Sequence, residues 1–309
     1  MEEIIITDVA PRDGLQNQPV AISTSAKLQL IDLLVKAGVP SIEATSFVSP
    51  KAVPQMADAT DVIGAVAGRD DIRISSLAPN LRGLERAMAA GAREIAIVLS
   101  ATETMNRKNI NMSLDEAASV SEETLRVAKS AGLRTRAYVA VAFECPFEGL
   151  TPLDRVLQLA RRMDDAGGDE IVIADTIGAA APAQVKAAFL ALREAIPVER
   201  IGAHFHNTRG MGAANAWAAL EAGVRRFDAS AGGIGGCPFA PGASGNLATE
   251  DLVLMAEQSG FSTGISLDGI LEAVTFAEAQ LGRSLGGEAL SWYRSRKARL
   301  AKQAVASEL

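Results

Sequence analysis

The sequence is poor in cysteine and has no long hydrophobic run. Only two cysteines, Cys145 and Cys237, occur among 309 residues, which fits a reducing compartment better than a disulfide framework. No apolar run approaches the roughly 18 residues that a membrane span requires. The first residues have neither the basic flank nor the apolar stretch of a signal peptide. We therefore expect a cytoplasmic protein that does not enter a membrane.

Basic residues are also in deficit. The chain has 30 lysines and arginines against 37 acidic residues, a net charge of −7 and a pI near 5.1, and no dense basic stripe. This balance disfavours nucleic acid as a partner. Apolar residues make up 48 % and charged residues 22 %, as in an ordinary globular protein with a large core. No linker divides the chain, so we predict a single domain over residues 1–309.

Short β-branched runs alternate with longer stretches of helical period along most of the chain. Eight strands, each followed by a helix, predict an α/β fold of the (β/α)8 or TIM-barrel type. The predicted strands are 4–9, 41–45, 72–77, 94–99, 135–142, 170–174, 200–205 and 225–229. The predicted helices are 24–37, 54–67, 80–91, 114–131, 152–167, 183–196, 210–222 and 249–258.

Two features refine this prediction. A doubly wound open sheet would give a similar local pattern, but usually with fewer strands and a glycine fingerprint after the first strand. The segment APRDG at 10–14 does not match that fingerprint. Beyond the barrel, 266–304 has the pattern of two further helices, and we expect 266–309 to form a C-terminal helical extension packed on the barrel.

Histidine is as scarce as cysteine, and the two histidines are two positions apart. His204 and His206 lie at the end of the predicted strand 200–205. Side chains at i and i+2 of a strand project from the same face, so the two rings would point into one space from positions about 6 to 7 Å apart along the backbone. This spacing suits two ligands of a divalent metal. The alternative is a pair of hydrogen-bonded histidines at a strand end.

Further polar residues follow the carboxyl ends of other strands, where TIM barrels hold their active sites. Asp13 follows strand 1, and Asn246 lies in the loop after strand 8. Asp13 with the two histidines makes a mixed nitrogen and oxygen set, to which Asn246 would add a carbonyl oxygen. Such a set suits Mg²⁺, Mn²⁺ or Co²⁺. For Asp13 alone, the alternative is a turn residue before Gly14.

Arg12 and Glu43 are candidate charged groups beside this site. Arg12 is a fixed cation whose planar donors suit an oxygen that becomes an enolate, although a surface salt bridge is the alternative. Glu43 lies between Ile42 and Ala44 on a predicted barrel strand, where a carboxylate is costly unless it is paired. It would orient Arg12 or a metal ligand, or form a purely structural ion pair.

Cys237 and Asp175 are the candidates for proton transfer. Cys237 lies in the glycine-rich loop 231–246, from which a thiol that reaches the cavity would donate or take a proton. An incidental loop cysteine is the alternative. Asp175 follows the apolar run 171–174 and is the best carboxylate for general acid and base work, or else it caps the next turn. Cys145 is interpreted as structural.

Three segments carry a family resemblance. They are PRDGLQN at 11–17, SFVSPK at 46–51 with VPQM at 53–56, and GGIGGCPFAPGASGNLATED at 232–251. Together they resemble the 3-hydroxy-3-methylglutaryl-CoA lyases, metal-dependent TIM-barrel enzymes whose signature loop is similar to the last segment. The resemblance implies the retro-Claisen cleavage of 3-hydroxy-3-methylglutaryl-CoA to acetyl-CoA and acetoacetate. It also implies an acyl-CoA as substrate and a homo-oligomer, a dimer or larger.

The same resemblance assigns roles to the candidate residues. It implies that a divalent cation, Mg²⁺ or Mn²⁺, is held by Asp13, His204, His206 and Asn246. Arg12 would stabilise the acetyl-CoA enolate. The supporting or proton-transfer groups would be Glu43, Asp175 and Cys237.

The chain departs from the family pattern near the expected acyl pocket. HFHNTRGM at 204–211 replaces the usual HCHDTYGQ, Val172 and Ala174 stand where Ser and Gly are expected, and Gln18 replaces a usual Glu. These changes would retune which acyl group is accepted. Arg209 would bring a new contact to a carboxylate, and Ser46 is a second predicted substrate contact. For the CoA nucleotide the sequence offers only Lys51 and Asn80.

Three other functions compete with this interpretation. The nearest is a lyase for a related substrate such as citramalyl-CoA, which would give acetyl-CoA and pyruvate. A Claisen synthase shares the arginine, the aspartate and the paired histidines, but generally has a longer C-terminal portion and lacks the GGCP segment. A non-catalytic barrel that binds metal or CoA would be expected to lose a ligand or Cys237, and all of these residues are present.

Overall fold

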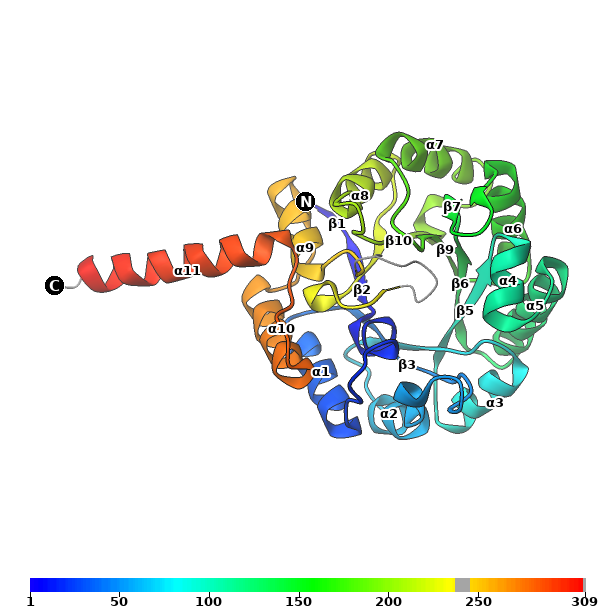
Figure 1. Ribbon diagram of the computed structural model, residues 1–309, viewed down its shortest axis with the longest axis horizontal. Coiled ribbons are helices and arrows are strands. Elements are labelled where there is room, and N and C mark those ends of the chain that lie inside the picture. Colours follow the sequence, from blue (N-terminus) through cyan, green and yellow to red (C-terminus); the bar gives the residue numbers. More distant parts are fainter. Residues whose placement is uncertain (237–244, 308–309) are drawn as a thin grey trace.

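The protein folds as a closed barrel of parallel strands surrounded by helices (Figure 1). The computed structural model describes residues 1–236 and 245–307. The barrel strands, in spatial order, are β10 (Ile201–Phe205), β11 (Arg226–Ala229), β2 (Ile5–Asp8), β3 (Ser41–Ser46), β4 (Arg73–Leu77), β5 (Glu94–Ser100), β6 (Arg134–Ala140) and β9 (Glu170–Asp175). Each predicted strand corresponds to one of them, so the predicted TIM barrel is confirmed.

The barrel strands are short and largely buried. Every residue of β3 and of β9 is buried, because the outer face packs under helices and the inner face fills the barrel. The last barrel strand, β11, pairs in parallel with the first, β2, and this pairing closes the barrel. Closure brings the carboxyl ends of β2, β10 and β11 together, although β2 lies about two hundred residues before the other two in the chain.

The predicted helices are present with ends shifted by a few residues. They are α1 (Thr24–Lys36), α2 (Ala59–Val66), α3 (Leu81–Ala89), α5 (Leu114–Ser130), α6 (Leu153–Asp165), α7 (Pro182–Leu192), α8 (Gly212–Glu221) and α9 (Thr249–Gln258). Local capping explains several starts. The Ser23 hydroxyl accepts the Ala26 N–H in α1, and Ser113 with Glu116 forms a capping box in α5.

The structure also has elements that the sequence did not predict. Two of them matter for the site: the π-helix η1 (Ala10–Gly14) after β2, and α4 (Glu103–Ile110) after β5. The others are the 3-10 turns η2 (Pro54–Met56), η3 (Val198–Arg200) and η4 (Ala231–Gly233), the parallel pair β1 (Glu2–Glu3) with β12 (Phe261–Ser262), and the hairpin β7 (Glu144–Cys145) with β8 (Gly149–Leu150). They are too short to produce a readable hydrophobic period.

The C-terminal extension behaves in two ways. As predicted, α10 (Leu267–Leu281) packs on the barrel wall beside α1. By contrast, α11 (Glu288–Ser307) contacts α9 and α10 along its first half, through residues up to Lys297, and it extends away from the barrel (Figure 1). The prediction that the whole extension packs on the barrel is therefore wrong for α11.

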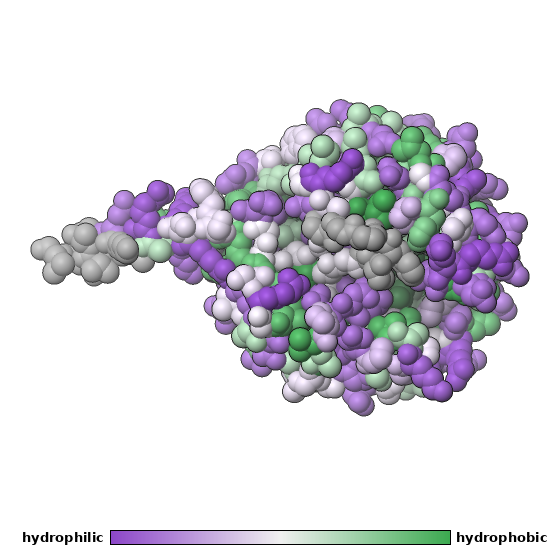
Figure 2. Space-filling view, in the orientation of Figure 1, coloured by the Kyte–Doolittle hydropathy of each residue, from purple (hydrophilic) through white to green (hydrophobic). Residues whose placement is uncertain are grey.

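The composition of α11 explains this departure. Arg294 and Lys297 pair with acidic residues of α10, and the helix is largely hydrophilic in Figure 2. Trp292 is 48 % exposed and Leu300 is 51 % exposed, so these two large apolar side chains of α11 do not turn toward the body of the barrel. Among the described residues, none of the helices combines the length and apolarity that crossing a membrane requires.

Candidate active site

A cavity of about 160 Å³ opens at the carboxyl end of the barrel. Four of the predicted site residues line it, and they come from η1 and from the end of β10. The described lining residues are Arg12, Asp13, Gln16, Asn17, Val98, Ser100, Met105, Asn109, Tyr138, Ala140, Ala174, Thr176, His204, His206 and Gly236. Four of the site residues predicted from the sequence therefore lie at this cavity.

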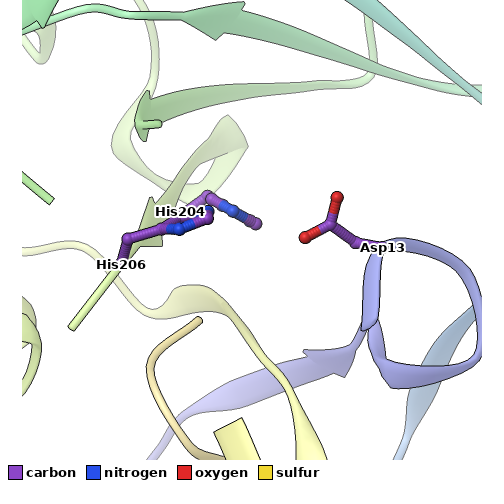
Figure 3. Close-up of side chains that lie close together, drawn as sticks. All are labelled: Asp13, His204 and His206. Carbon is purple, nitrogen blue, oxygen red and sulfur yellow. The ribbon is translucent and has the colours of Figure 1, made fainter. Parts of the chain in front are cut away.

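Asp13, His204 and His206 form a three-residue cluster. One potential ligand atom from each lies within 4.8 Å of the others, and Figure 3 shows the Asp13 carboxylate pointing toward the two imidazoles. The histidines project from the same side of β10 and its continuation, with ring centroids 5.2 Å apart. This is the geometry that the i and i+2 spacing predicts.

Asn246 completes this set. Its Nδ2 donates to Asp13 Oδ2 over 2.7 Å and to the Ile234 carbonyl over 3.0 Å. Its Oδ1 is buried and has no hydrogen-bond partner among the described residues. A buried amide oxygen without a partner is costly, and a cation beside the cluster would satisfy it. The donor set therefore fits a divalent cation with oxygen and imidazole ligands.

Gly235 leaves room for this arrangement. A Cβ at this position would lie 2.3 Å from Asn246 Nδ2 and 3.2 Å from Asp13 Oδ2, and the residue has a φ of +128°. Both the space and the backbone conformation thus require glycine. The glycine-rich sequence of the loop is, at this position, a packing requirement of the candidate metal centre.

Arg12 is held between two carboxylates beside the cavity. Its Nε donates to Glu43 Oε2 over 2.6 Å, its Nη2 lies 2.5 Å from the same oxygen, and its Nη1 donates to Asp13 Oδ1 over 2.8 Å. Burial opposes the charge of Arg12, but Glu43 and Asp13 raise its pKa overall. Burial likewise acts to raise the pKa of Asp13, whereas Arg12 and the histidines lower it overall.

Glu43 is fully buried, and burial raises the pKa of its carboxyl even though Arg12 opposes the shift. Only Oε2 binds Arg12, while Oε1 has no hydrogen-bond partner among the described residues. Glu43 thus contacts Arg12, one of the partners considered for it in the sequence, and its role in orienting Arg12 stays a prediction. A surface salt bridge for Arg12, the alternative considered above, is excluded because Arg12 is only 6 % exposed.

Asp228 is a site residue that the sequence analysis missed. It lies on β11, next to His204 in the strand register, and its Oδ2 is 3.0 Å from His204 Nδ1. Burial acts to raise its pKa, but Arg136 and His204 lower it far below the usual range. The sequence did contain a signal for Asp228. It is a carboxylate within the predicted strand 225–229, just as Glu43 is a carboxylate within the predicted strand 41–45.

Asp8 is a second missed residue, and it fixes the position of η1. Its carboxylate accepts the backbone N–H groups of Ala10 and Ala231, at 2.8 and 3.0 Å, and the Thr249 hydroxyl at 2.7 Å. One buried carboxylate therefore links the segment that carries Arg12 to the base of the loop after β11. Burial raises the pKa of Asp8 to about 7 despite these hydrogen bonds.

Asp175 and Arg209 contact backbone groups. Asp175 accepts the N–H groups of Ala179 and Ala180, at 2.8 and 3.1 Å, which is the turn-capping alternative. Burial raises its pKa. Arg209 donates to the carbonyls of Gly178, Ala179 and Ala180. Neither residue lines the cavity, because the strand alternation turns the neighbours of Asp175 inward instead.

The remaining predicted residues are spread over the same end of the barrel. Ser46 ends β3, and its buried hydroxyl is not part of the cavity lining. Asn80 caps α3 by accepting the Gly83 N–H, and Lys51 is exposed. Cys145 is buried, with the Thr102 hydroxyl 3.1 Å from its sulfur, as expected of a structural thiol. Cys237 lies outside the described residues.

The α4 side of the cavity was not predicted. Met105 and Asn109 come from α4, and Gln16 and Asn17 follow η1. Asn17 also donates to the Gly236 carbonyl over 3.0 Å. The stretch between the predicted strand 94–99 and the predicted helix 114–131 is too long for a simple connection, and that length was the available signal.

Sequence and structure comparisons agree on the relatives. A family model described as HMGL-like matches residues 3–276. The hydroxymethylglutaryl-CoA lyase of Bacillus subtilis (strain 168) is 43 % identical over 294 residues, which cover 95 % of this chain and 98 % of that protein. The human mitochondrial hydroxymethylglutaryl-CoA lyase is 43 % identical over 282 residues, covering 91 % and 87 %.

Two solved structures are similar over nearly the whole chain. The crystal structure of the Bacillus subtilis HMG-CoA lyase matches with a TM-score of 0.91 and 42 % identity, covering 95 % of this chain and 99 % of that one. An HMG-CoA lyase from Acinetobacter baumannii, in complex with coenzyme A and 3-methylmalate, matches with a TM-score of 0.89 and 41 % identity, covering 93 % and 94 %.

Proposed function

The chain belongs to the HMG-CoA lyase family, and from this premise we propose that it cleaves 3-hydroxy-3-methylglutaryl-CoA to acetyl-CoA and acetoacetate. The observation that carries the proposal is the convergence of Asp13, His204, His206 and Asn246 beside Arg12 at the cavity mouth. Relatives named as HMG-CoA lyases cover nearly the whole chain. A carbon–carbon lyase acting on an acyl-CoA is the function that both lines of argument favour.

The donor set defines how a metal would contribute. A divalent cation held by Asp13, His204, His206 and Asn246 would supply Lewis acidity toward the substrate oxygens near C3. We propose Mg²⁺ or Mn²⁺, because carboxylate and amide oxygens favour such cations. The protein contributes a prearranged set of ligands, with Asp13 fixed by Arg12 and Asn246.

Arg12 is placed to stabilise the charge that develops during cleavage. Loss of the C3 hydroxyl proton and rupture of the C2–C3 bond move an electron pair onto the thioester, as the enolate of acetyl-CoA. The guanidinium lines the cavity and is fixed by Glu43 and Asp13, so its remaining N–H groups need little reorganisation to reach the enolate oxygen. Donors of this preorganised kind contribute more in a buried site than in water.

A proton must then reach C2 of the enolate to complete acetyl-CoA. We assign this step to Cys237, whose loop starts at the site residues Ile234 and Gly235 and returns at Asn246. Asp175 is a weaker candidate, because both of its oxygens accept backbone N–H groups. Cys237 and Asp175 are also the two candidates for the base that removes the C3 hydroxyl proton.

Further parts of the proposal concern the assembly and the substrate. The apolar side chains of Val98, Ala140 and Ala174 line one part of the cavity, which suits the methyl substituent at C3. We propose a cytoplasmic location from the composition of the chain, and a homo-oligomeric state and a substrate contact for Ser46 from the family resemblance. The carboxylate contact predicted for Arg209 is not part of this proposal, because its guanidinium donates to the carbonyls of Gly178 and Ala180.

The test is release of acetyl-CoA by the purified protein. Hydroxymethylglutaryl-CoA and citramalyl-CoA would be offered side by side with Mg²⁺ or Mn²⁺, with and without a chelator. We expect turnover of hydroxymethylglutaryl-CoA to acetoacetate, abolished by the chelator and reduced in a Cys237→Ala variant. Turnover of citramalyl-CoA alone, or no turnover of either, would contradict the proposal.

A further inference from the structure

A buried polar network lies directly beneath the candidate metal centre. It joins Arg136 and Tyr138 of β6, Glu170 of β9, His204 of β10 and Asp228 of β11. None of these residues is more than 7 % exposed. Tyr138 faces the cavity with its ring, and its hydroxyl points into the network. Only His204 among these residues has a role in the function proposed above, and the other four have none.

Asp228 is the centre of the network. Its Oδ1 accepts Arg136 Nη2 over 2.7 Å, and its Oδ2 accepts the Tyr138 hydroxyl over 2.7 Å and faces His204 Nδ1 at 3.0 Å. Arg136 Nη1 also donates to the Tyr138 oxygen over 2.9 Å. The tyrosine oxygen therefore already accepts a hydrogen bond from Arg136, and its own hydroxyl hydrogen is donated to Asp228.

The proton on the His204 ring is thereby located. A carboxylate offers only acceptors, so the Nδ1 that faces Asp228 must carry the proton. In a neutral ring the second nitrogen, Nε2, then has a free lone pair. The ring lines the cavity with Asp13 and His206. Nε2 is therefore the ligand atom that His204 presents to a cation.

We propose that Asp228, anchored by Arg136 and Tyr138, is a positioning residue that fixes the tautomer and orientation of His204 for metal binding. The inference rests on the proposed function insofar as that function assigns a metal to the site. Carboxylate partners of metal-binding histidines typically change metal affinity by about 10- to 100-fold. Asp228 thus acts on the metal centre through His204 and touches no substrate atom.

Arg136 offers a matched control within the same network. Its Nε and Nη2 also donate to Glu170 Oε1, over 3.1 and 2.7 Å. Glu170 and Asp228 are buried to a similar degree and share this one arginine, but among these two carboxylates only Asp228 contacts His204. Asp228→Asn and Glu170→Gln therefore disturb the arginine alike, and they differ in what they do to the histidine.

The first measurement is Mn²⁺ binding by isothermal titration to metal-free protein. In Asp228→Asn, the amide oxygen is expected to face Arg136 and the NH2 to face His204, so the ring proton moves to Nε2. We expect Mn²⁺ affinity to fall about 10- to 100-fold in Asp228→Asn and to stay within about two-fold in Glu170→Gln. Tyr138→Phe, which keeps the His204–Asp228 contact, should fall between them. Equal losses in Asp228→Asn and Glu170→Gln, or unchanged affinity in Asp228→Asn, would overturn the inference.

The second measurement needs no substitution of the network. Because the chain has only two histidines, ¹⁵N-histidine labelling with long-range ¹H–¹⁵N spectra reads both tautomers, and His206→Ala assigns the remaining signals to His204. We expect a protonated Nδ1 and an unprotonated Nε2 in the metal-free protein. The opposite tautomer would refute the role of Asp228. If this tautomer is found but the wild-type protein binds no Mn²⁺, the proposed metal-dependent function fails, and the metal-binding role of Asp228 fails with it.

Discussion

The two ends of the barrel both hold arginine–glutamate pairs, but in different arrangements. At the amino end, Arg73 donates through Nε and Nη2 to both oxygens of Glu94, and Arg134 and Arg226 lie near Glu94 and Glu170. At the carboxyl end, Arg12 binds one oxygen of Glu43, while the other oxygen of Glu43 and Asn246 Oδ1 have no partner among the described residues. Oxygen atoms left for a ligand distinguish the second arrangement, because Arg226 Nη1, which also has no hydrogen-bond partner in the described part of the chain, faces Glu170 Oε2 at 3.6 Å.

Cavity volume does not make this distinction. A cavity of about 210 Å³ lies near the amino end, lined by apolar side chains of α2 and β4 and by Arg73 and Glu94. It is larger than the cavity of about 160 Å³ at the metal centre. Its charged groups pair with each other and form no cluster of potential metal ligands among the described residues. At the carboxyl end, by contrast, Asp13, His204 and His206 bring potential ligand atoms together at the cavity. We infer that a convergence of potential ligand atoms, more than the volume of the cavity, distinguishes the functional end of the barrel.

The largest effect is expected at the metal ligands. His206→Ala or Asp13→Asn should remove Mn²⁺ binding and lower kcat/KM by roughly three orders of magnitude or more, because several kcal/mol of transition-state stabilisation are lost. Calorimetric titration and acetyl-CoA release measure the two effects. A variant that lost neither would remove the functional distinction between the two ends.

A smaller loss is expected for Arg12. Arg12→Gln should lower kcat by about 10²- to 10³-fold, as for the loss of one preorganised donor to a developing oxyanion. Arg12→Lys is the control, since it keeps the charge without the planar fork. Mn²⁺ affinity should change far less than kcat in both variants. A proportional loss of metal affinity would mean that Arg12 acts mainly by holding Asp13.

The amino end should respond in stability alone. Glu94→Gln removes the charge that faces Arg73 and is expected to cost about 1 to 3 kcal/mol of unfolding free energy, without a change in kcat. Denaturant unfolding and steady-state kinetics on the same preparation make the comparison. A large loss of kcat at unchanged stability would show that charge at the amino end also serves catalysis.

The smallest effect is expected at Arg209. Because its guanidinium donates to the carbonyls of the turn after β9, Arg209→Ala should change the KM for hydroxymethylglutaryl-CoA by less than about three-fold, within the usual small effect of surface substitutions. Arg209→Lys serves as the charge-conserving control. A ten-fold rise in KM that is restored in Arg209→Lys would instead support the carboxylate contact predicted from the sequence.

Periodic features could be predicted from the sequence, whereas the direction in which an individual side chain points could not. Most of the eight barrel strands were located because they have a short β-branched apolar run, and 225–229, which has no β-branched residue, was located by its place in the alternation of strands and helices. His204 and His206 were paired because strand geometry fixes the i and i+2 directions. Asp175 was harder to interpret, since one residue along a strand decides whether a side chain faces the cavity or a turn. In the structure, the Asp175 side chain faces the turn that follows β9 and accepts the Ala179 N–H.

By itself the sequence determined the order of strands and helices, the scarce imidazoles, and the acids and amides that follow strand ends. Only the tertiary structure decided which of these residues meet. Closure of β11 onto β2 brings Asp8 to Ala231, and the β10–β11 register sets Asp228 beside His204. The physical reason is that side-chain chemistry is local, whereas the pairing of buried donors and acceptors depends on strand register and barrel closure.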